Sequence, residues 1–254
     1  MPLKYVAVGD STVEGLEDPG PDGLYVGWAD RLAGHLAAVH DEVHYANLAV
    51  RGLTAAEVRT TQLEAALALQ PDLAVVVAGV NDVLQPRFDR AALREDLFVM
   101  HQALRDAGAQ VLTFTMPDMT RVAPLAVFLR GRLRALNEIT HELGERLGSL
   151  VVDLAAEPVS THPGLWHDDR LHANSEGHRR IALALAEALG IDAGDWRTPL
   201  PDAAGEPLVT IVGREIGWVA GHLLPWLWRR VRRGPEQQPA TCKRPDLLLV
   251  ERAG

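Results

Sequence analysis

Residues 5–12 read Tyr-Val-Ala-Val-Gly-Asp-Ser-Thr, and the fold prediction starts from them. Its first four residues are apolar without alternation, which is typical of a strand covered on both faces of a sheet. Gly9 then lets the chain turn, and Ser11 follows just beyond the strand. Because functional groups collect at the carboxyl ends of strands in an open parallel sheet, the stretch predicts a serine presented into a crevice.

Short apolar runs alternate with longer amphipathic segments along the rest of the chain. This alternation predicts one doubly wound α/β domain over residues 1–195, with a parallel sheet wrapped by helices. Thr54, with Glu57 three residues later, has the pattern of a capping box at the start of a helix. We expect strands at Tyr5–Val8, Val43–Leu48, Leu73–Ala78, Gln110–Phe114 and Leu150–Leu154. We expect helices at about Trp28–Val39, Ala55–Leu69, Ala91–Ala107, Ala123–Leu147 and Ser175–Leu189.

The overall composition narrows the class of protein. The chain has 254 residues, of which 47% are hydrophobic and 23% charged, as in soluble globular proteins. Its net charge of −9 argues against nucleic acid as a partner. Cys242 is the only cysteine, which excludes an intramolecular disulfide and a zinc site built on several thiolates. No secretory signal is recognisable before the first strand, so we expect a cytoplasmic protein.

Ser11 is the first candidate for chemistry. It is one of four serines in the chain, and it alone directly follows a predicted strand. A serine hydroxyl is a weak nucleophile that needs a base within hydrogen-bonding reach. Taken alone, Ser11 is more readily explained as a turn or helix-capping residue.

Two further strand ends carry groups suited to binding an oxyanion. Gly52 stands just before Thr54, at a predicted helix N-terminus with free backbone N–H groups. Asn81 follows the third strand, where its amide can point at a developing negative charge. Each has a simpler interpretation as well, a turn glycine and an Asx-turn asparagine.

The last predicted strand leads to residues 167–174, which read His-Asp-Asp-Arg-Leu-His-Ala-Asn. Asp169 and His172 lie three positions apart, so on one helical turn or tight loop their side chains fall on the same side. This suits a carboxylate that orients an imidazole and stabilises the imidazolium formed during a reaction.

A metal site is the competing interpretation of this region. It would use His162, His167, Asp168 and His172, but their spacing matches no compact ligand set. A metal site there would also leave the serine and asparagine at the other strand ends unexplained. We therefore expect no metal.

The four fragments occur in order at four strand ends, and as a set they resemble the SGNH, or GDSL-like, hydrolase family over about residues 4–190. The resemblance implies a flavodoxin-like three-layer α/β/α sandwich with five parallel strands and no cofactor. It also implies roles for particular residues: nucleophile for Ser11, oxyanion-hole donors for Gly52 (backbone) and Asn81 (side chain), and an Asp-x-x-His pair for Asp169 and His172.

Two departures from the family pattern are visible. Thr12 stands where the name GDSL has Leu, and Arg170 and Ala173 stand where Gly and Pro are frequent in the last block. Neither departure touches the nucleophile or the acid–base pair. We expect the remaining carboxylates of these blocks, Asp10 and Asp82, to hydrogen-bond backbone groups of their own loops.

The resulting hypothesis is a serine esterase that hydrolyses small-molecule carboxylic esters. Ser11 attacks the carbonyl, His172 accepts its proton, and the oxyanion is held by the backbone N–H groups of Ser11 and Gly52 and by the Asn81 amide. We expect short to medium acyl groups, because no long apolar groove is evident in the core sequence. The same site would serve a carbohydrate O-acetyl esterase, a thioesterase or an acyltransferase. The alternative outside the enzymes is a non-catalytic protein that docks on a membrane surface or a partner protein.

Residues 196–254 differ in character and form a predicted C-terminal extension. Leu208–Trp228 is apolar and rich in tryptophan, the basic run Arg229–Arg233 follows, and the remaining tail has the composition of a poorly ordered segment. Internal charges and Pro225 argue against a membrane-spanning helix. The segment could pack on the core as an extra helix, contact a membrane surface through Leu208–Arg233, or form a lid or dimer contact. The sequence leaves the oligomeric state open.

Overall fold

The computed structural model describes residues 2–21, 23–201 and 241–251 of the chain. Within them, six strands form one sheet in the order β5-β4-β3-β1-β2-β6. The first five strands along the chain pair in parallel, and β6 pairs antiparallel with β2. The strands are β1 (Leu3–Gly9), β2 (Val43–Asn47), β3 (Leu73–Val77), β4 (Gln110–Phe114), β5 (Leu150–Val152) and β6 (Arg244–Leu249).

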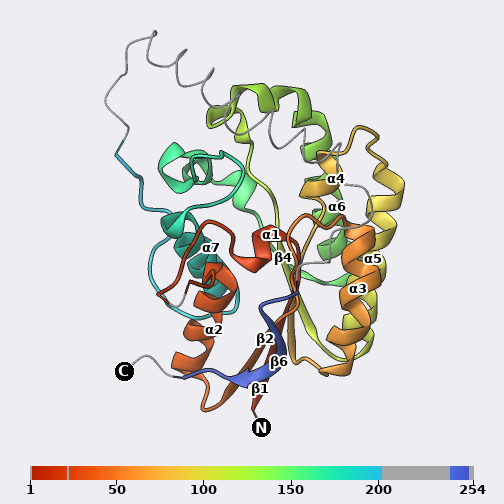
Figure 1. The fold of residues 1–254 in the computed structure, drawn as a ribbon, viewed down its shortest axis with the longest axis vertical. Helices are drawn as coiled ribbons and strands as arrows, with labels where there is room; N and C mark the ends of the chain where they lie inside the picture. Colours follow the sequence, from red (N-terminus) through yellow and green to blue (C-terminus); the bar gives the residue numbers. More distant parts are fainter. Residues whose placement is uncertain (1, 22, 202–240, 252–254) are drawn as a thin grey trace.

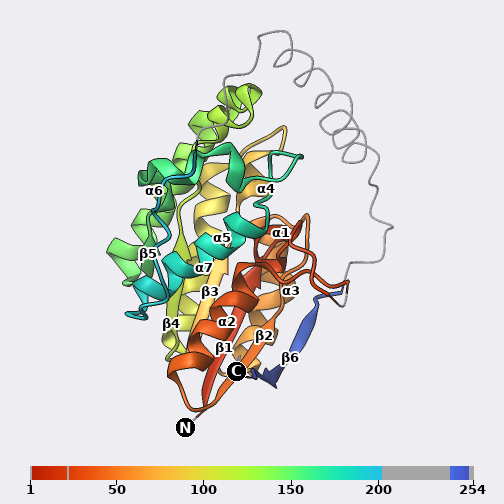
Figure 2. The same cartoon turned by 90° about the vertical axis from the view of Figure 1, so that its left-hand side faces the viewer.

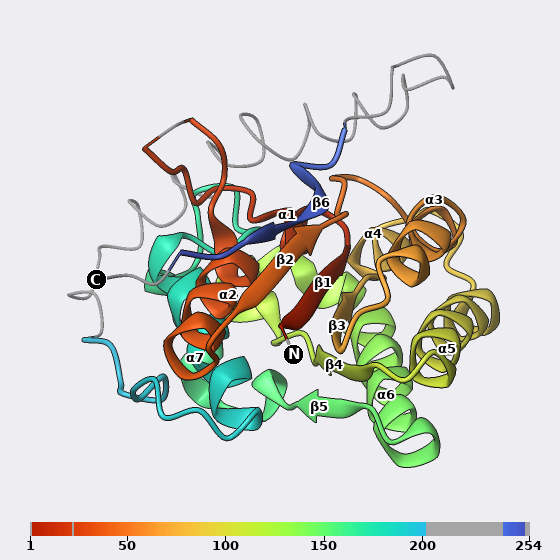
Figure 3. The ribbon, with the colours of Figure 1, turned by 90° about the horizontal axis from the view of Figure 1, so that it is seen from below.

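Helices cover both faces of the sheet, which gives three layers (Figure 3). One face carries α2 (Gly27–Val39) and α7 (Ser175–Ala188), which contact each other. The other face carries α3 (Ala55–Ala68), α5 (Arg90–Asp106) and α6 (Arg130–Leu147) (Figure 2). None of the helices in the described part of the chain is both long and apolar enough to cross a membrane.

Short elements occupy the loops that follow the strands. Two one-turn helices, α1 (Ser11–Glu14) and α4 (Val80–Val83), follow β1 and β3 directly (Figure 1). Five 3₁₀ turns complete the described elements: η1 (Met119–Arg121), η2 (Pro124–Leu129), η3 (Leu154–Ala156), η4 (Pro158–Thr161) and η5 (Pro163–Leu165).

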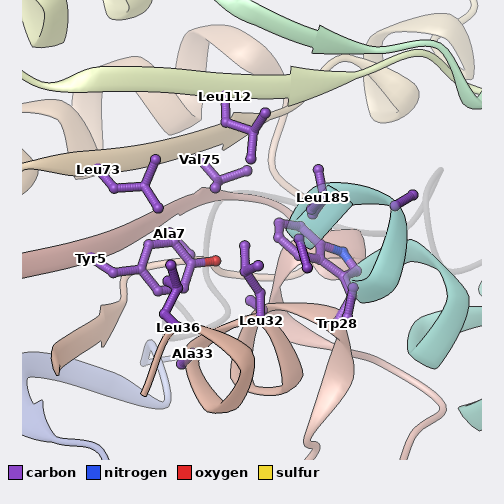
Figure 4. Packing of buried hydrophobic residues seen from close by; sticks show 14 of the residues in the cluster. Tyr5, Ala7, Trp28, Leu32, Ala33, Leu36, Leu73, Val75, Leu112 and Leu185 are labelled. Carbon is purple, nitrogen blue, oxygen red and sulfur yellow. The ribbon is translucent and has the colours of Figure 1, made fainter. Parts of the chain in front are cut away.

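The core lies between the sheet and its two helical layers. Residues 5–8 of β1 and all of β3 are buried, as the unbroken apolar runs predicted. On the α2 side, Trp28, Leu32 and Leu36 point toward the sheet (Figure 4). The indole of Trp28 meets the ring of Phe114 edge-on, with centroids 5.5 Å apart.

The predicted α/β fold with five parallel strands is confirmed, and the differences are local. The helix expected at Ala123–Leu147 begins at Arg130, because Pro124 starts the separate turn η2 instead. The capping box at Thr54 is present, with the Glu57 carboxylate accepting from the Thr54 backbone N–H at 2.8 Å.

The end of the chain departs from the prediction. The expectation of a poorly ordered tail is wrong for residues 241–250, because β6 extends the sheet beyond β2. Lys243, at the entry to β6, is held by the carbonyls of Tyr25 and Val26 at 2.8 Å each and by the Asp30 carboxylate at 2.9 Å. The predicted helix and basic run at Leu208–Arg233 lie outside the described residues.

The packed body also continues past residue 195. Trp196 is buried, and its carbonyl accepts a hydrogen bond from the buried guanidinium of Arg180 at 3.0 Å. The Trp196 indole donates to the Glu187 carboxylate at 2.8 Å. The first residues of the predicted extension therefore pack against α7 as part of the domain.

A buried histidine makes stability depend on pH. His101 is fully buried, its Nδ1 lies 2.9 Å from Ser149 Oγ, and its Nε2 has no hydrogen-bond partner in the described part of the chain. Burial, with a smaller effect of Arg105, lowers the pKa of His101 to about 3. In the unfolded chain His101 takes up a proton near pH 6.5, whereas in the folded protein it stays neutral. The unfolding free energy therefore falls as the pH drops below about 6.5.

We expect this residue to cost about 2 kcal/mol of unfolding free energy between pH 7.5 and pH 5. Urea unfolding at both pH values, for the wild type and for His101→Gln, measures the effect. The variant should lose correspondingly less stability on acidification. Equal losses in the two proteins would show that His101 is not responsible. The contributions of other titrating groups are common to both proteins and cancel when the two losses are subtracted.

Candidate active site

The turn at the end of β1 delivers Ser11 to the edge of the sheet. Gly9 has φ 158°, and a Cβ at this position would lie 2.1 Å from the carbonyl oxygen of Val77 on β3. Only glycine fits so close an approach. Asp10 then caps α1 by accepting from the Thr12 N–H at 3.0 Å, and Ser11 becomes the first residue of that helix.

A glutamine that the sequence analysis did not single out holds this turn. Gln62 of α3 is buried and bonds both backbone groups of Gly9: it accepts from the N–H at 2.9 Å and donates to the carbonyl at 2.8 Å. Its signal in the sequence is weak. Gln62 is a polar residue at four-residue spacing between Val58 and Ala66, on the face of α3 that is otherwise apolar.

Ser11, His172 and Asp169 form one continuous chain of contacts. Ser11 Oγ lies 2.9 Å from His172 Nε2, although the two residues are 161 positions apart. His172 Nδ1 lies 2.6 Å from Asp169 Oδ2. The other Asp169 oxygen accepts from the backbone N–H groups of Leu171 and His172 at 3.0 Å each, which fixes the carboxylate against the ring.

The protonation states follow from these contacts. Burial opposes ionisation of Asp169, but the hydrogen bonds and charge of His172, together with the two backbone donors, lower its pKa to about 2. An ionised carboxylate can only accept, so the proton of a neutral His172 sits on Nδ1. Nε2 then faces Ser11 with a free lone pair and can take a proton from the hydroxyl.

The departure at Arg170 has a structural consequence. Arg170 adopts φ 58°, in the left-handed region that favours the glycine frequent at this position in the family. The turn still places Asp169 and His172 side by side, and the isolated bridge between Trp166 and Ala173 closes the loop around them.

Asn81 and Gly52 lie at the same edge of the sheet. The Asn81 side chain is buried, and its Nδ2 donates to Asp10 Oδ2 at 3.2 Å and to the Leu53 carbonyl at 3.0 Å. Gly52 has φ 82° in the turn between β2 and α3, where glycine is favoured. The asparagine therefore connects the Ser11 loop with the turn that contains Gly52.

The two further carboxylates behave differently from each other. Asp10 bonds its own loop, as expected, and burial raises its pKa. Asp82 instead accepts from the Ala55 N–H at 2.9 Å, so it ties α4 to the start of α3 rather than to its own loop alone. Burial, partly offset by that bond and reinforced by Asp10 and Asp96, raises the pKa of Asp82 to about 6.

The four residues of the metal interpretation do not converge. Of His162, His167, Asp168 and His172, only His167 belongs to the one group of three ligand-type side chains found among the described residues, with Glu17 and Asp169. His162 caps η5 by accepting from the Gly164 N–H at 3.1 Å. Asp169 is already engaged with His172, so we assign no metal role to this group.

A second histidine, His178 of α7, holds the segments next to the site, and the sequence did not predict this role. His178 Nδ1 accepts from the Trp28 N–H at 3.2 Å, and its Nε2 donates to the Leu16 carbonyl at 3.0 Å. Burial lowers the pKa of His178 to about 4, so it acts as a neutral bridge. Asp18, in the same loop as Leu16, is buried against Arg31 with contacts of 2.8 to 3.1 Å. Neither role can be read from spacing, since the partners come from other segments.

Comparison with known proteins identifies the class to which this fold and site belong. The chain is an ester-hydrolysing enzyme, and it belongs to the GDSL-like lipase/acylhydrolase family, whose model matches residues 7–180. The predicted family membership is thereby confirmed. An acetylxylan esterase of Geobacillus stearothermophilus is 23% identical over 209 residues, covering 74% of this chain and 94% of that protein.

Solved structures share the fold. LAE5, an α/β hydrolase enzyme from the metagenome of Lake Arreo, matches with a TM-score of 0.64 at 21% identity, over 76% of this chain and 97% of that one. The structure of TesA matches with a TM-score of 0.60 at 24% identity, over 73% of this chain and 97% of its own. Strand β6 lies outside the region that the family model covers.

The Gly9 clamp yields a stability prediction. Gln62→Leu keeps a similar volume but removes the side-chain acceptor of the Gly9 N–H and one donor to the Gly9 carbonyl, which keeps the Val50 N–H at 3.2 Å. We therefore expect a loss of about 2 kcal/mol in unfolding free energy. Urea unfolding measures it. The matched control is Gln102→Leu on the exposed face of α5, which should change stability by less than about 0.5 kcal/mol. A loss no larger than that of the control would contradict the clamp.

Proposed function

We propose that this protein is a serine esterase in which Ser11 is the nucleophile, His172 the general base and Asp169 the residue that orients His172. The observation that carries the proposal is the chain of contacts from Ser11 Oγ through the imidazole to Asp169, at 2.9 and 2.6 Å. A serine and an imidazole so placed are the arrangement that makes a hydroxyl nucleophilic near neutral pH.

The reaction proceeds in two halves. His172 Nε2 takes the Ser11 proton as the oxygen attacks the ester carbonyl, and the protonated imidazole then gives that proton to the departing alcohol. Water, activated by the same nitrogen, hydrolyses the acyl-serine and releases the carboxylic acid. Asp169 remains ionised throughout and stabilises the imidazolium, in keeping with its pKa of about 2.

The oxyanion is held by the backbone N–H groups of Ser11 and Gly52 and by the Asn81 amide. In the resting structure Asn81 Nδ2 donates to Asp10 and Leu53. An oxyanion must therefore replace one of these acceptors. The longer contact, at 3.2 Å to Asp10, is the one we expect to yield. Asp10 would keep its other oxygen on the Thr12 N–H during the exchange.

Small-molecule carboxylic esters with short to medium acyl groups are the proposed substrates. A carbohydrate O-acetyl ester is the second candidate, and the acetylxylan esterase relative favours it. Thioesters and acyl transfer would use the same residues. Peripheral membrane contact through Leu208–Arg233 stays a prediction, because that segment lies outside the described residues.

Hydrolysis of p-nitrophenyl acetate, butyrate and octanoate by the wild type and by Ser11→Ala tests the nucleophile. We expect Ser11→Ala to lose at least about 10³-fold in kcat/KM. Ser160→Ala is the matched control, a nearly buried serine in η4 whose backbone carbonyl, rather than its hydroxyl, accepts from the Trp166 indole. It should keep the wild-type rate. Wild-type activity in Ser11→Ala would refute the assignment. Faster release of acetate from acetylated xylo-oligosaccharides than from p-nitrophenyl acetate would select the carbohydrate ester.

The role of Asp169 is tested by Asp169→Asn. The amide preserves shape but can present an N–H to His172 and favour the wrong tautomer, so we expect kcat to fall by about 10³- to 10⁴-fold. Asp168→Asn, at the exposed neighbouring residue, is the control and should keep its rate. Steady-state kinetics on p-nitrophenyl acetate suffices for both. If the two variants were equally active, Asp169 would have no orienting role.

A further inference from the structure

Arg51, the residue before Gly52, is bound to the helix that begins with Ser11. Its Nε lies 3.1 Å from each carboxylate oxygen of Glu14, and its Nη2 makes a closer contact with the same carboxylate. The backbone N–H of Arg51 also donates to Glu14 at 3.0 Å. Glu14 is buried and is the last residue of α1. One carboxylate thus fixes both the main chain and the side chain of Arg51.

A second segment braces the same guanidinium. The ring of Tyr25, in the loop before α2, lies under it, with 5.2 Å between the guanidinium carbon and the ring centroid. The Tyr25 carbonyl is in turn held by the Lys243 ammonium at 2.8 Å. The Lys243 side chain is only 9% exposed and also bonds Val26 and Asp30. The strand that closes the sheet edge is therefore anchored to the loop that supports Arg51.

We propose that Arg51 is a positioning residue for the oxyanion hole, and that β6 secures it through Lys243 and Tyr25. The inference rests on the proposed esterase function. The contacts that run from β6 to Arg51 lie partly outside the region matched by the family model, since both Lys243 and β6 follow residue 180.

The physical reason lies in where the donors sit. The N–H of Ser11 belongs to α1, whereas the N–H of Gly52 belongs to the peptide unit that begins with the carbonyl carbon of Arg51. Two donors on separate segments stabilise one oxyanion only if each is placed at hydrogen-bonding distance from it, with an accuracy of about half an ångström. Glu14 connects the two segments directly: it is part of α1, and it holds the residue whose carbonyl carbon carries the Gly52 nitrogen. The Arg51 side chain is 42% exposed but its Glu14 partner is buried, so the pair also contributes to stability. The positioning effect is therefore measured as turnover of the folded protein.

The central test is Arg51→Met, which keeps an unbranched side chain but removes the guanidinium. On p-nitrophenyl acetate we expect kcat to fall about tenfold with KM changed by less than about twofold, because the transition state loses alignment while ground-state binding is kept. Glu14→Gln, which retains shape and weaker hydrogen bonds, should fall in the same direction by a smaller factor. It keeps the test decisive if Arg51→Met folds poorly.

A matched control separates positioning from general stabilisation. Arg94 pairs with Glu142 at 2.7 Å and lies over the Phe98 ring at 4.1 Å, the same combination of contacts, but between α5 and α6 on the outer face. Arg94→Met should leave kcat unchanged. A loss of kcat in Arg94→Met equal to that in Arg51→Met would overturn the proposal.

The part played by β6 is tested by Lys243→Met alone and combined with Arg51→Met. Lys243→Met should lower kcat by about threefold, and the double variant should be no slower than Arg51→Met, because the two residues act through one path. Fully multiplicative losses would remove β6 from the proposal. Normal kcat in Arg51→Met beside an inactive Ser11→Ala would overturn the positioning role alone. Wild-type activity in Ser11→Ala would instead overturn the proposed function.

Discussion

The turn at Gly9 places Ser11 at the edge of the sheet, and the other contacts of the site are built around it. A buried parallel strand must end, turn within two residues and present a polar side chain at the sheet edge. A Cβ at position 9 would lie 2.1 Å from the Val77 carbonyl oxygen, so only glycine fits there. Gln62 forms hydrogen bonds with the N–H and the carbonyl of Gly9, which the turn leaves buried in the core. With these in place, Ser11 starts a helix whose far end, Glu14, organises the neighbouring turn.

Electrostatic differences between carboxylates at one edge of the sheet follow from their partners. Asp169 faces His172 and two backbone donors, and its pKa falls to about 2. Burial, reinforced by the nearby Asp10 and Asp96 and partly offset by the Ala55 N–H, raises the pKa of Asp82 to about 6. A carboxylate that stays ionised can hold an imidazole in one tautomer through a reaction, which suits Asp169 to the orienting role proposed for it. Asp10 and Asp82 instead accept from backbone N–H groups and join loops.

The returning strand β6 changes how the C-terminal part of the chain is understood. Five parallel strands with β2 at the edge would leave that edge open, and β6 covers it by pairing antiparallel with β2. The buried ammonium of Lys243 replaces water with two carbonyls and a carboxylate, which ties the edge to the start of α2. The same contact reaches Tyr25 and, through its ring, Arg51. Lys243 thus both fixes the strand that covers the β2 edge and supports the turn that contains Gly52.

Apolar periodicity and turn residues are local signals, and they were enough to predict the succession of strands and helices, the buried strands and the residues at the strand ends. Ser11, Gly52, Asn81, Asp169 and His172 could all be named as candidates on that basis. The contact between Ser11 and His172, which are 161 positions apart but 2.9 Å from each other, depends on the folded structure. So do the roles of Gln62 and His178 in holding the loops around them, and the place of a leucine-rich stretch near the end of the chain in the sheet. These are pairings between distant segments, and a pattern of residues does not specify the partner of a polar group until the fold brings the two together.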